Sequence, residues 1–175
     1  MAWWGLGLAC LALTSGACVI PLPYEDPVPD GGANYPPLIV ASTVKIPGPL
    51  LLTLGPDGRP SLDSISITVQ DRDVEDTIYA RVFRDYNFDQ PTPPYVSTEK
   101  ASTPGSTSIA RTLSLPTNTW CNTAMQDVPL VFDVVVADRK FDENPTVKPA
   151  YRAVTAGGEF SVGSWVVTCH SAGGN

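Results

Sequence analysis

Turn-forming residues divide this chain into short apolar segments, and that division limits the folds the chain can adopt. Its 175 residues include 18 prolines and 14 glycines, and Asn, Asp, Ser and Thr gather between the apolar runs. Proline removes a backbone donor and interrupts helices, so this spacing favours many short strands over long helices. We therefore expect an all-β domain with a core of ordinary size.

Two segments alternate between apolar and polar residues, as half-buried strands do. They read LDSISITVQ at 62–70 and TIYARVFRD at 77–85. The polar stretch DRDVED at 71–76 lies between them. We expect the two segments to pair as an antiparallel hairpin closed by a solvated loop.

Further segments have the composition of strands, and together they predict a β-sandwich of about seven strands. They are residues 37–46, 48–60, 107–115, 128–141, 150–154 and 158–170. The proline-bearing stretch 86–106 is expected to be a long connection. This arrangement resembles an immunoglobulin-like sandwich with Greek-key connections over about residues 38–170.

The first residues have the composition of an export signal. Residues 2–13 are almost wholly apolar, which is near the length of a signal-peptide core and short of a membrane-spanning helix. The small residues TSGA at 14–17 then precede Cys18. Six prolines between 21 and 37 follow, and they predict a semi-rigid, polyproline-like linker.

The sequence SGAC at 15–18 resembles the lipobox of bacterial lipoproteins, in which the chain is cut before a cysteine that becomes acylated. Gly16 and Ala17 match that pattern, whereas Leu is usual at the position of Ser15. The resemblance implies a lipoprotein signal peptide at 1–17, a lipidated Cys18 and a linker at 18–37. The pattern of strands predicts a sandwich domain at 38–170, followed by a flexible tail at 171–175.

The layout resembles that of Gram-negative lipoproteins, which implies an outer-membrane lipoprotein of the cell envelope facing the periplasm or the surface. Three alternatives stay open for the leader. An ordinary signal peptidase would leave Cys18 unmodified, residues 2–20 could form an uncleaved anchor, or the segment could be a buried core helix.

The cysteine count bears on the same question. Cys10 would leave with the signal peptide and Cys18 would carry lipid, so Cys121 and Cys169 remain as an even pair. In an exported domain such a pair predicts a disulfide, with two buried free thiols as the alternative.

Acidic residues gather in two places. Asp71, Asp73, Glu75 and Asp76 share one loop and are weak candidates for Ca²⁺, but a solvated loop is the preferred interpretation. Asp138, Asp142 and Glu143 are mixed with Arg139 and Lys140, and we expect a solvated loop there too.

The remaining chemistry favours a binding or structural role. The net charge of −7 argues against nucleic acid, and the single histidine, His170, gives little basis for nucleophilic catalysis. We expect no enzyme activity and no cofactor. The expected function is a lipid-anchored envelope module for protein interaction or structural support. The alternative is a module that binds glycan or Ca²⁺, with tryptophans and tyrosines available for a sugar-binding face.

Overall fold

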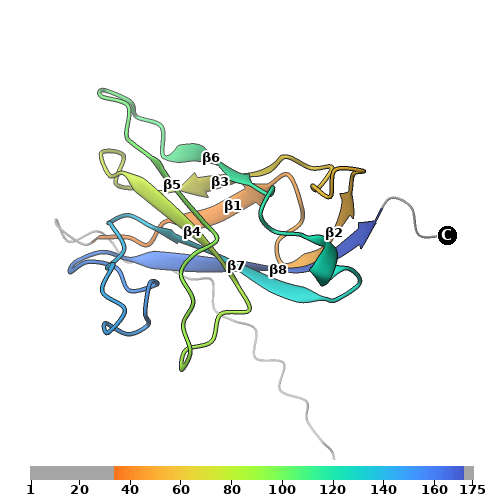
Figure 1. Ribbon diagram of the computed structural model, residues 1–175. Coiled ribbons are helices and arrows are strands. Elements are labelled where there is room, and N and C mark those ends of the chain that lie inside the picture. Colours follow the sequence, from red (N-terminus) through yellow and green to blue (C-terminus); the bar gives the residue numbers. More distant parts are fainter. Residues whose placement is uncertain (1–33, 172–175) are drawn as a thin grey trace, which may run out of the picture. The chain divides into compact units, whose positions relative to one another are not determined.

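A computed structural model describes residues 34–171 of the chain (Figure 1). The predicted signal peptide, Cys18, most of the predicted linker and nearly all of the predicted tail lie outside the described residues. The last residues of the predicted linker contact the domain. The Asn34 side chain donates to the backbone oxygen of Gly157 at 2.7 Å, and the Ser161 hydroxyl donates to that of Pro37 at 2.6 Å.

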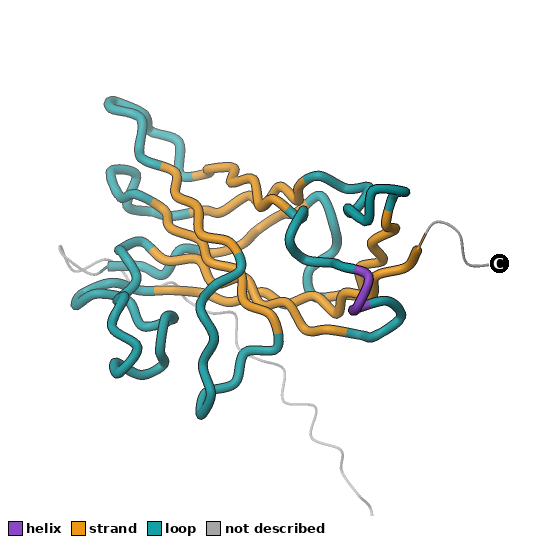
Figure 2. Tube along the Cα trace, in the orientation of Figure 1, coloured by secondary structure: helices purple, strands orange, loops and turns teal. Residues whose placement is uncertain are grey.

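Within residues 34–171, eight strands form two sheets where about seven strands were expected, and the fold is an all-β sandwich, as predicted. The three-stranded sheet has the order β1-β3-β6, and the five-stranded sheet has the order β2-β8-β7-β4-β5. The strands are β1 (Leu38–Ser42), β2 (Gly48–Leu54), β3 (Ser64–Gln70), β4 (Ile78–Arg84), β5 (Val96–Lys100), β6 (Ala110–Pro116), β7 (Leu130–Ala137) and β8 (Phe160–Ser171). The only helical turn within residues 34–171 is η1 (Thr123–Met125), which follows β6 (Figure 2).

The main core lies between the two sheets and comes from the alternation that the sequence displays. Ile65, Ile67 and Val69 of β3 are fully buried, and so are the inward residues Phe132 and Val134 of β7. All neighbouring strands pair antiparallel except β2 and β8, which run parallel. The alternation at residues 62–70 therefore identified the face of β3 that is buried in the main core.

The expected hairpin between β3 and β4 is wrong. Strand β3 pairs with β1 and β6, whereas β4 pairs with β5 and β7, so residues 71–77 cross from one sheet to the other. Alternation shows that a strand buries one face, but it does not show which strand lies beside it. Two strands with the same pattern can therefore occupy opposite layers of the sandwich.

Two further expectations are corrected. The connection predicted at 86–106 contains β5, a short edge strand in which only Val96 is buried. Residues 150–154 form no strand and make a single bridge from Val154 to Phe141. Both segments depend on their partners, since neither has an apolar pattern strong enough to define a strand by itself.

A second, smaller core covers the outer face of the five-stranded sheet. Phe83, Val135, Ala137 and Phe141 are buried there, and the segment after β7 packs over them. Arg152 lies within this layer. Its guanidinium carbon is 3.7 Å from the centre of the Tyr86 ring, and its Nη2 pairs with the Asp133 Oδ2 at 2.5 Å. Side chains of β4 that face away from the main core are therefore buried as well.

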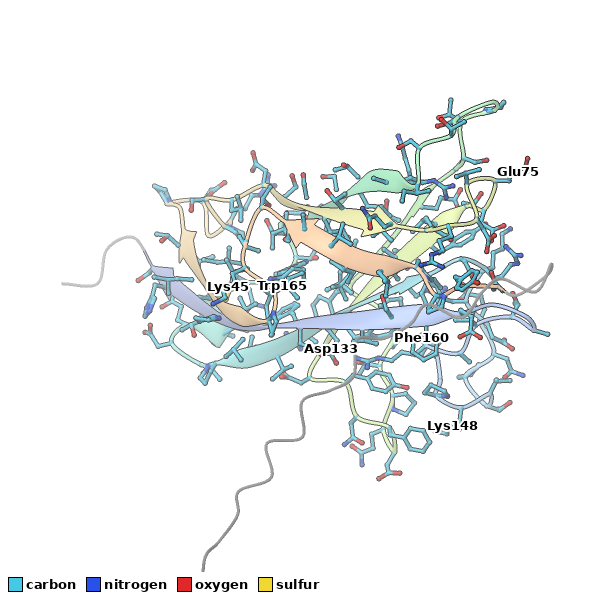
Figure 3. All side chains as sticks on the ribbon, turned by 180° about the vertical axis from the view of Figure 1, so that it is seen from behind. Lys45, Glu75, Asp133, Lys148, Phe160 and Trp165 are labelled. Carbon is cyan, nitrogen blue, oxygen red and sulfur yellow. A yellow bond between two sulfur atoms is a disulfide. The ribbon has the colours of Figure 1, made fainter. Side chains whose placement is uncertain are left out.

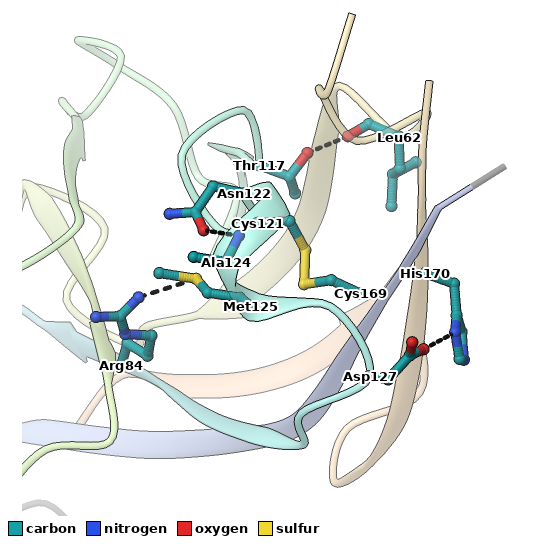
Figure 4. The surroundings of a disulfide bond; sticks show 10 residues. All are labelled: Leu62, Arg84, Thr117, Cys121, Asn122, Ala124, Met125, Asp127, Cys169 and His170. Atoms are coloured by element: carbon teal, nitrogen blue, oxygen red, sulfur yellow. Dashed lines mark hydrogen bonds and ion pairs between the residues drawn. A yellow bond between two sulfur atoms is a disulfide. The ribbon is translucent and has the colours of Figure 1, made fainter. Parts of the chain in front are cut away.

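The predicted disulfide is confirmed. Cys121 and Cys169 are bonded, their Cα atoms lie 5.9 Å apart, and the pair is 4% and 0% exposed (Figure 4). Trp120, next to Cys121, stacks on Phe132 with the ring centres 4.8 Å apart. Its ring centre is 5.7 Å from that of Trp165 in β8. The bond thus joins the loop after β6, a strand of the smaller sheet, to β8 of the larger sheet.

Replacing both cysteines, Cys121→Ala with Cys169→Ala, should lower the free energy of unfolding by about 4 kcal/mol, because the bond closes a loop with a sequence separation of 48. Urea unfolding of the oxidised wild type and the double variant measures this difference. The single variant Cys121→Ala should behave like the double variant. Equal stability of the oxidised wild type and the double variant would contradict the result.

Candidate functional site

The loop that crosses between the sheets carries the predicted acidic cluster, and the structure corrects its expected solvation. Asp71 is 2% exposed, its Oδ1 accepts the Asp73 amide at 2.9 Å, and its Oδ2 is buried without a partner among the described residues. Glu75 is exposed and lies at the outer end of the loop (Figure 3). Asp71 is buried because the chain enters the crossing between two packed layers, so it is not at the tip of a hairpin.

Two arginines balance the charge of this loop. Arg139 pairs with Asp76 at 2.5 Å. Arg111 of β6 is 8% exposed and donates to the backbone oxygens of Val74 and Asp76. Arg139 and Arg111 therefore hold the crossing loop in place, Arg139 through a carboxylate and Arg111 through backbone oxygens.

Asp138, which was expected in a solvated loop, is only 1% exposed, so that expectation is wrong for this residue. Its Oδ1 accepts the Glu159 amide at 2.9 Å, and its Oδ2 accepts the Asn34 side chain at 2.5 Å.

Burial raises the pKa of Asp71 from 3.8 to about 6, and the charges of Asp73, Asp76 and Asp138 act in the same direction. The hydrogen bond from the Asp73 amide opposes that rise.

The structure does not assemble the Ca²⁺ candidates into a metal site. Within residues 34–171, no three Asp, Glu, His or Cys side chains are arranged to hold a metal ion. Asp76 is already paired with Arg139, and Glu75 faces solvent. The contacts of the crossing loop are those of a charge-balanced structural element.

A cavity of about 490 Å³ opens on the outer face of the five-stranded sheet. Strands β4 and β5 pair there with Tyr79 opposite Glu99 and Arg81 opposite Ser97, and these side chains form its floor. The segment after β7 supplies Lys140, Phe141 and Glu143 as its wall. This volume is within the range of small-ligand pockets, so the cavity is the candidate functional site.

Arg81 is the main charged group of the cavity. Its side chain is 7% exposed, its guanidinium lies 4.6 Å from the centre of the Phe141 ring, and it donates to the Tyr151 backbone oxygen at 2.9 Å. Tyr151 adopts a positive φ of 62°, which is unusual for a bulky residue. The other terminal nitrogen, Nη2, donates to the Oε1 of Glu143, whose side chain is 75% exposed.

The tryptophans and tyrosines considered for a sugar-binding face do not share one surface. Trp120 and Trp165 are fully buried in the main core, whereas Tyr79 lines the cavity. His170 pairs with Asp127, close to the disulfide (Figure 4). Arg81 was not among the residues predicted from the sequence. The available signal was a lone cation between apolar neighbours at an outward position of a strand.

Comparison of the chain with protein-family models, with curated proteins and with solved structures gives no match. In the part of the chain that the structure describes, no helix is long and apolar enough to span a membrane.

Asp71→Asn should change how stability depends on pH. Wild-type Asp71 binds protons more tightly in the folded protein, at a pKa of about 6 against 3.8, so its contribution to the free energy of unfolding falls as pH rises from 4 to 6. The loss is at most ~3 kcal/mol at 1.36 kcal/mol per pH unit. Asp71→Asn lacks this loss, so its stability relative to wild type should increase over the same interval.

Urea unfolding at pH values between 4 and 7 measures this difference. The exposed Asp89→Asn serves as the matched control and should follow the wild type. Parallel pH curves for wild type and Asp71→Asn would show that Asp71 does not titrate as described.

Proposed function

We propose that the protein is an exported, lipid-anchored and non-enzymatic module of the cell envelope that mediates protein interaction or structural support. The observation that carries this proposal is the buried Cys121–Cys169 disulfide. Disulfides form and persist in oxidising compartments and are rare in the cytosol. The bond supports export, and export is what the apolar leader and the residues before Cys18 predict.

The anchor in this proposal is Cys18, acylated after removal of residues 1–17. The Pro-rich segment 18–37 would hold the sandwich away from the bilayer, since a polyproline-like chain extends by about 3.1 Å per residue. The membrane is then reached through lipid, and the domain is left to contact another envelope protein. An outer-membrane lipoprotein is the corresponding location.

We also propose that the sandwich is of the immunoglobulin-like, Greek-key kind. The strand order supports this assignment, because β1-β3-β6 and β8-β7-β4-β5 correspond to the A-B-E and G-F-C-C′ orders of that fold. Strand β2 adds to the second sheet, parallel to β8. The disulfide lies elsewhere than the inter-sheet bond of antibody domains, since β3 and β7 contain no cysteine.

Ligand binding is the second candidate function, and the cavity around Arg81 favours it. The cavity combines a buried cation, hydroxyl groups and two aromatic residues, which are the groups that orient small polar ligands. Of the two ligand classes considered from the sequence, glycan fits this lining, whereas Ca²⁺ would meet Arg81 and Lys140.

Cys18→Ala should abolish acylation and move the protein from the detergent phase to the aqueous phase. Expression in a Gram-negative host with labelled palmitate, followed by phase partition and mass spectrometry, measures both effects. Cys10→Ala is the matched control, because Cys10 leaves with the signal peptide and the variant should be processed like the wild type. An intact Met1 in the mature wild type, or equal labelling of Cys18→Ala, would overturn the anchor.

A further inference from the structure

We propose that the cavity on the outer face of β4 and β5 binds a carboxylate-bearing ligand through Arg81, and that Glu143 occupies the carboxylate position until the ligand displaces it. This inference rests on the second candidate function, ligand binding. The ligand is defined by its chemistry: a carboxylate attached to a small polar body, of the size of a sugar acid or the C-terminal end of a short peptide.

The first support is the way in which Arg81 is fixed. Only 7% of its side chain is exposed, and the Phe141 ring and the Tyr151 carbonyl hold its guanidinium in place. A planar guanidinium that is already oriented binds carboxylates with two parallel hydrogen bonds and loses little entropy in doing so. The domain therefore presents a preformed carboxylate receptor at the floor of an open cavity.

The second support is the present partner of that receptor. Glu143 reaches Arg81 from the wall of the cavity, and three quarters of its side chain is exposed. If Glu143 leaves, its carboxylate enters water at little cost, and the site regains a buried cation without a carboxylate. Because Glu143 is largely solvated and Arg81 is buried, a ligand carboxylate enclosed by the cavity can replace Glu143 at the guanidinium.

The Arg152–Asp133 pair on the same face shows how a purely structural ion pair differs. Arg152 and Asp133 are 14% and 18% exposed, and the Ser164 hydroxyl donates to the second Asp133 oxygen at 2.6 Å. Both partners are closed in beneath the loops, and neither lines the Arg81 cavity. The Arg81–Glu143 pair has one closed partner and one open partner, which is the arrangement that permits exchange.

The rest of the lining fits a small polar carboxylate. Lys140 adds a second cation, so that without Glu143 the cavity carries Arg81 and Lys140 against Glu99. Ser97, which is opposite Arg81 on the floor of the cavity, and Tyr79 supply hydroxyl groups for the body of the ligand. The cavity volume of about 490 Å³ accommodates a monosaccharide or a dipeptide.

The test uses the full chain, purified in detergent, with paired probes that differ in the carboxylate. One pair is D-glucuronate and D-glucose, and the other is N-acetyl-Ala-Ala and its C-terminal amide. Nuclear magnetic resonance titration of the arginine Nε–H signals follows binding, and the arm that responds identifies a sugar acid or a peptide terminus as the source of the carboxylate. Binding of at least one carboxylate probe and neither neutral probe is the expected result.

Two variants give opposite effects. Glu143→Gln removes the internal competitor and should tighten binding by about two- to fivefold, whereas Arg81→Met should weaken it by about tenfold or more. Arg81→Lys, which keeps the charge but not the two-pronged geometry, should also weaken binding. Glu159→Gln makes the same charge change at an exposed residue outside the cavity and should leave affinity unchanged.

The outcomes separate this inference from the function on which it rests. Equal binding of carboxylate and neutral probes would leave ligand binding in place and overturn the carboxylate assignment. No binding of any probe to wild type or to Glu143→Gln would overturn both. Glu143→Gln keeps the test decisive if Arg81→Met fails to fold, because unchanged affinity in Glu143→Gln would by itself reject displacement.

Discussion

The contact of Trp120 with Phe132 and Trp165 is the interaction on which the rest of the sandwich depends. Trp120 lies in the loop after β6, so its burial brings the end of the smaller sheet onto the inner face of the larger one. The neighbouring disulfide then makes that contact permanent. Thr117, at the start of the same loop, donates its hydroxyl to the Leu62 backbone oxygen and fixes the other end. Apolar packing provides the attraction here, and the covalent bond limits how far the unfolded chain can separate these segments.

Buried arginines hold together parts of the fold that lie outside the main apolar core. Arg111 holds the crossing between the sheets through backbone oxygens, and Arg152 joins the outer layer of aromatic residues to Asp133. Arg81 resembles them in burial but differs in its partner, which is exposed. A buried guanidinium needs its hydrogen bonds satisfied, and the domain satisfies most of them with carbonyls and closed carboxylates. The exposure of Glu143 is the reason for proposing the cavity as the place where the domain accepts another molecule.

Periodicity in the sequence predicted the faces of β3 and β4 that lie in the main core, and the even number of remaining cysteines predicted their bond, because both signals are local or follow from counting. It could not predict that β3 and β4 belong to different sheets, since partner choice depends on packing between distant segments. The burial of Asp71 was equally hidden, because carboxylates are rarely buried and DRDVED has the composition of an exposed turn. Arg81 was visible only as a lone cation between apolar neighbours, and its role could not be predicted, since its partner Glu143 lies in a distant loop and the cavity exists only after β5 and the segment beyond β7 come together.

The parallel pairing of β2 with β8 has a consequence for the order of events during biosynthesis. Gly48 near the start of the domain lies opposite Trp165 near its end, so the larger sheet stays open at one edge until residues 160–171 have been made. The disulfide has the same requirement, because Cys169 lies in that last strand. A ribosome or a translocation pore that releases the chain from its amino end therefore handles an incompletely folded polypeptide for nearly its whole length. Such late, long-range closure makes folding slow compared with that of chains rich in local contacts.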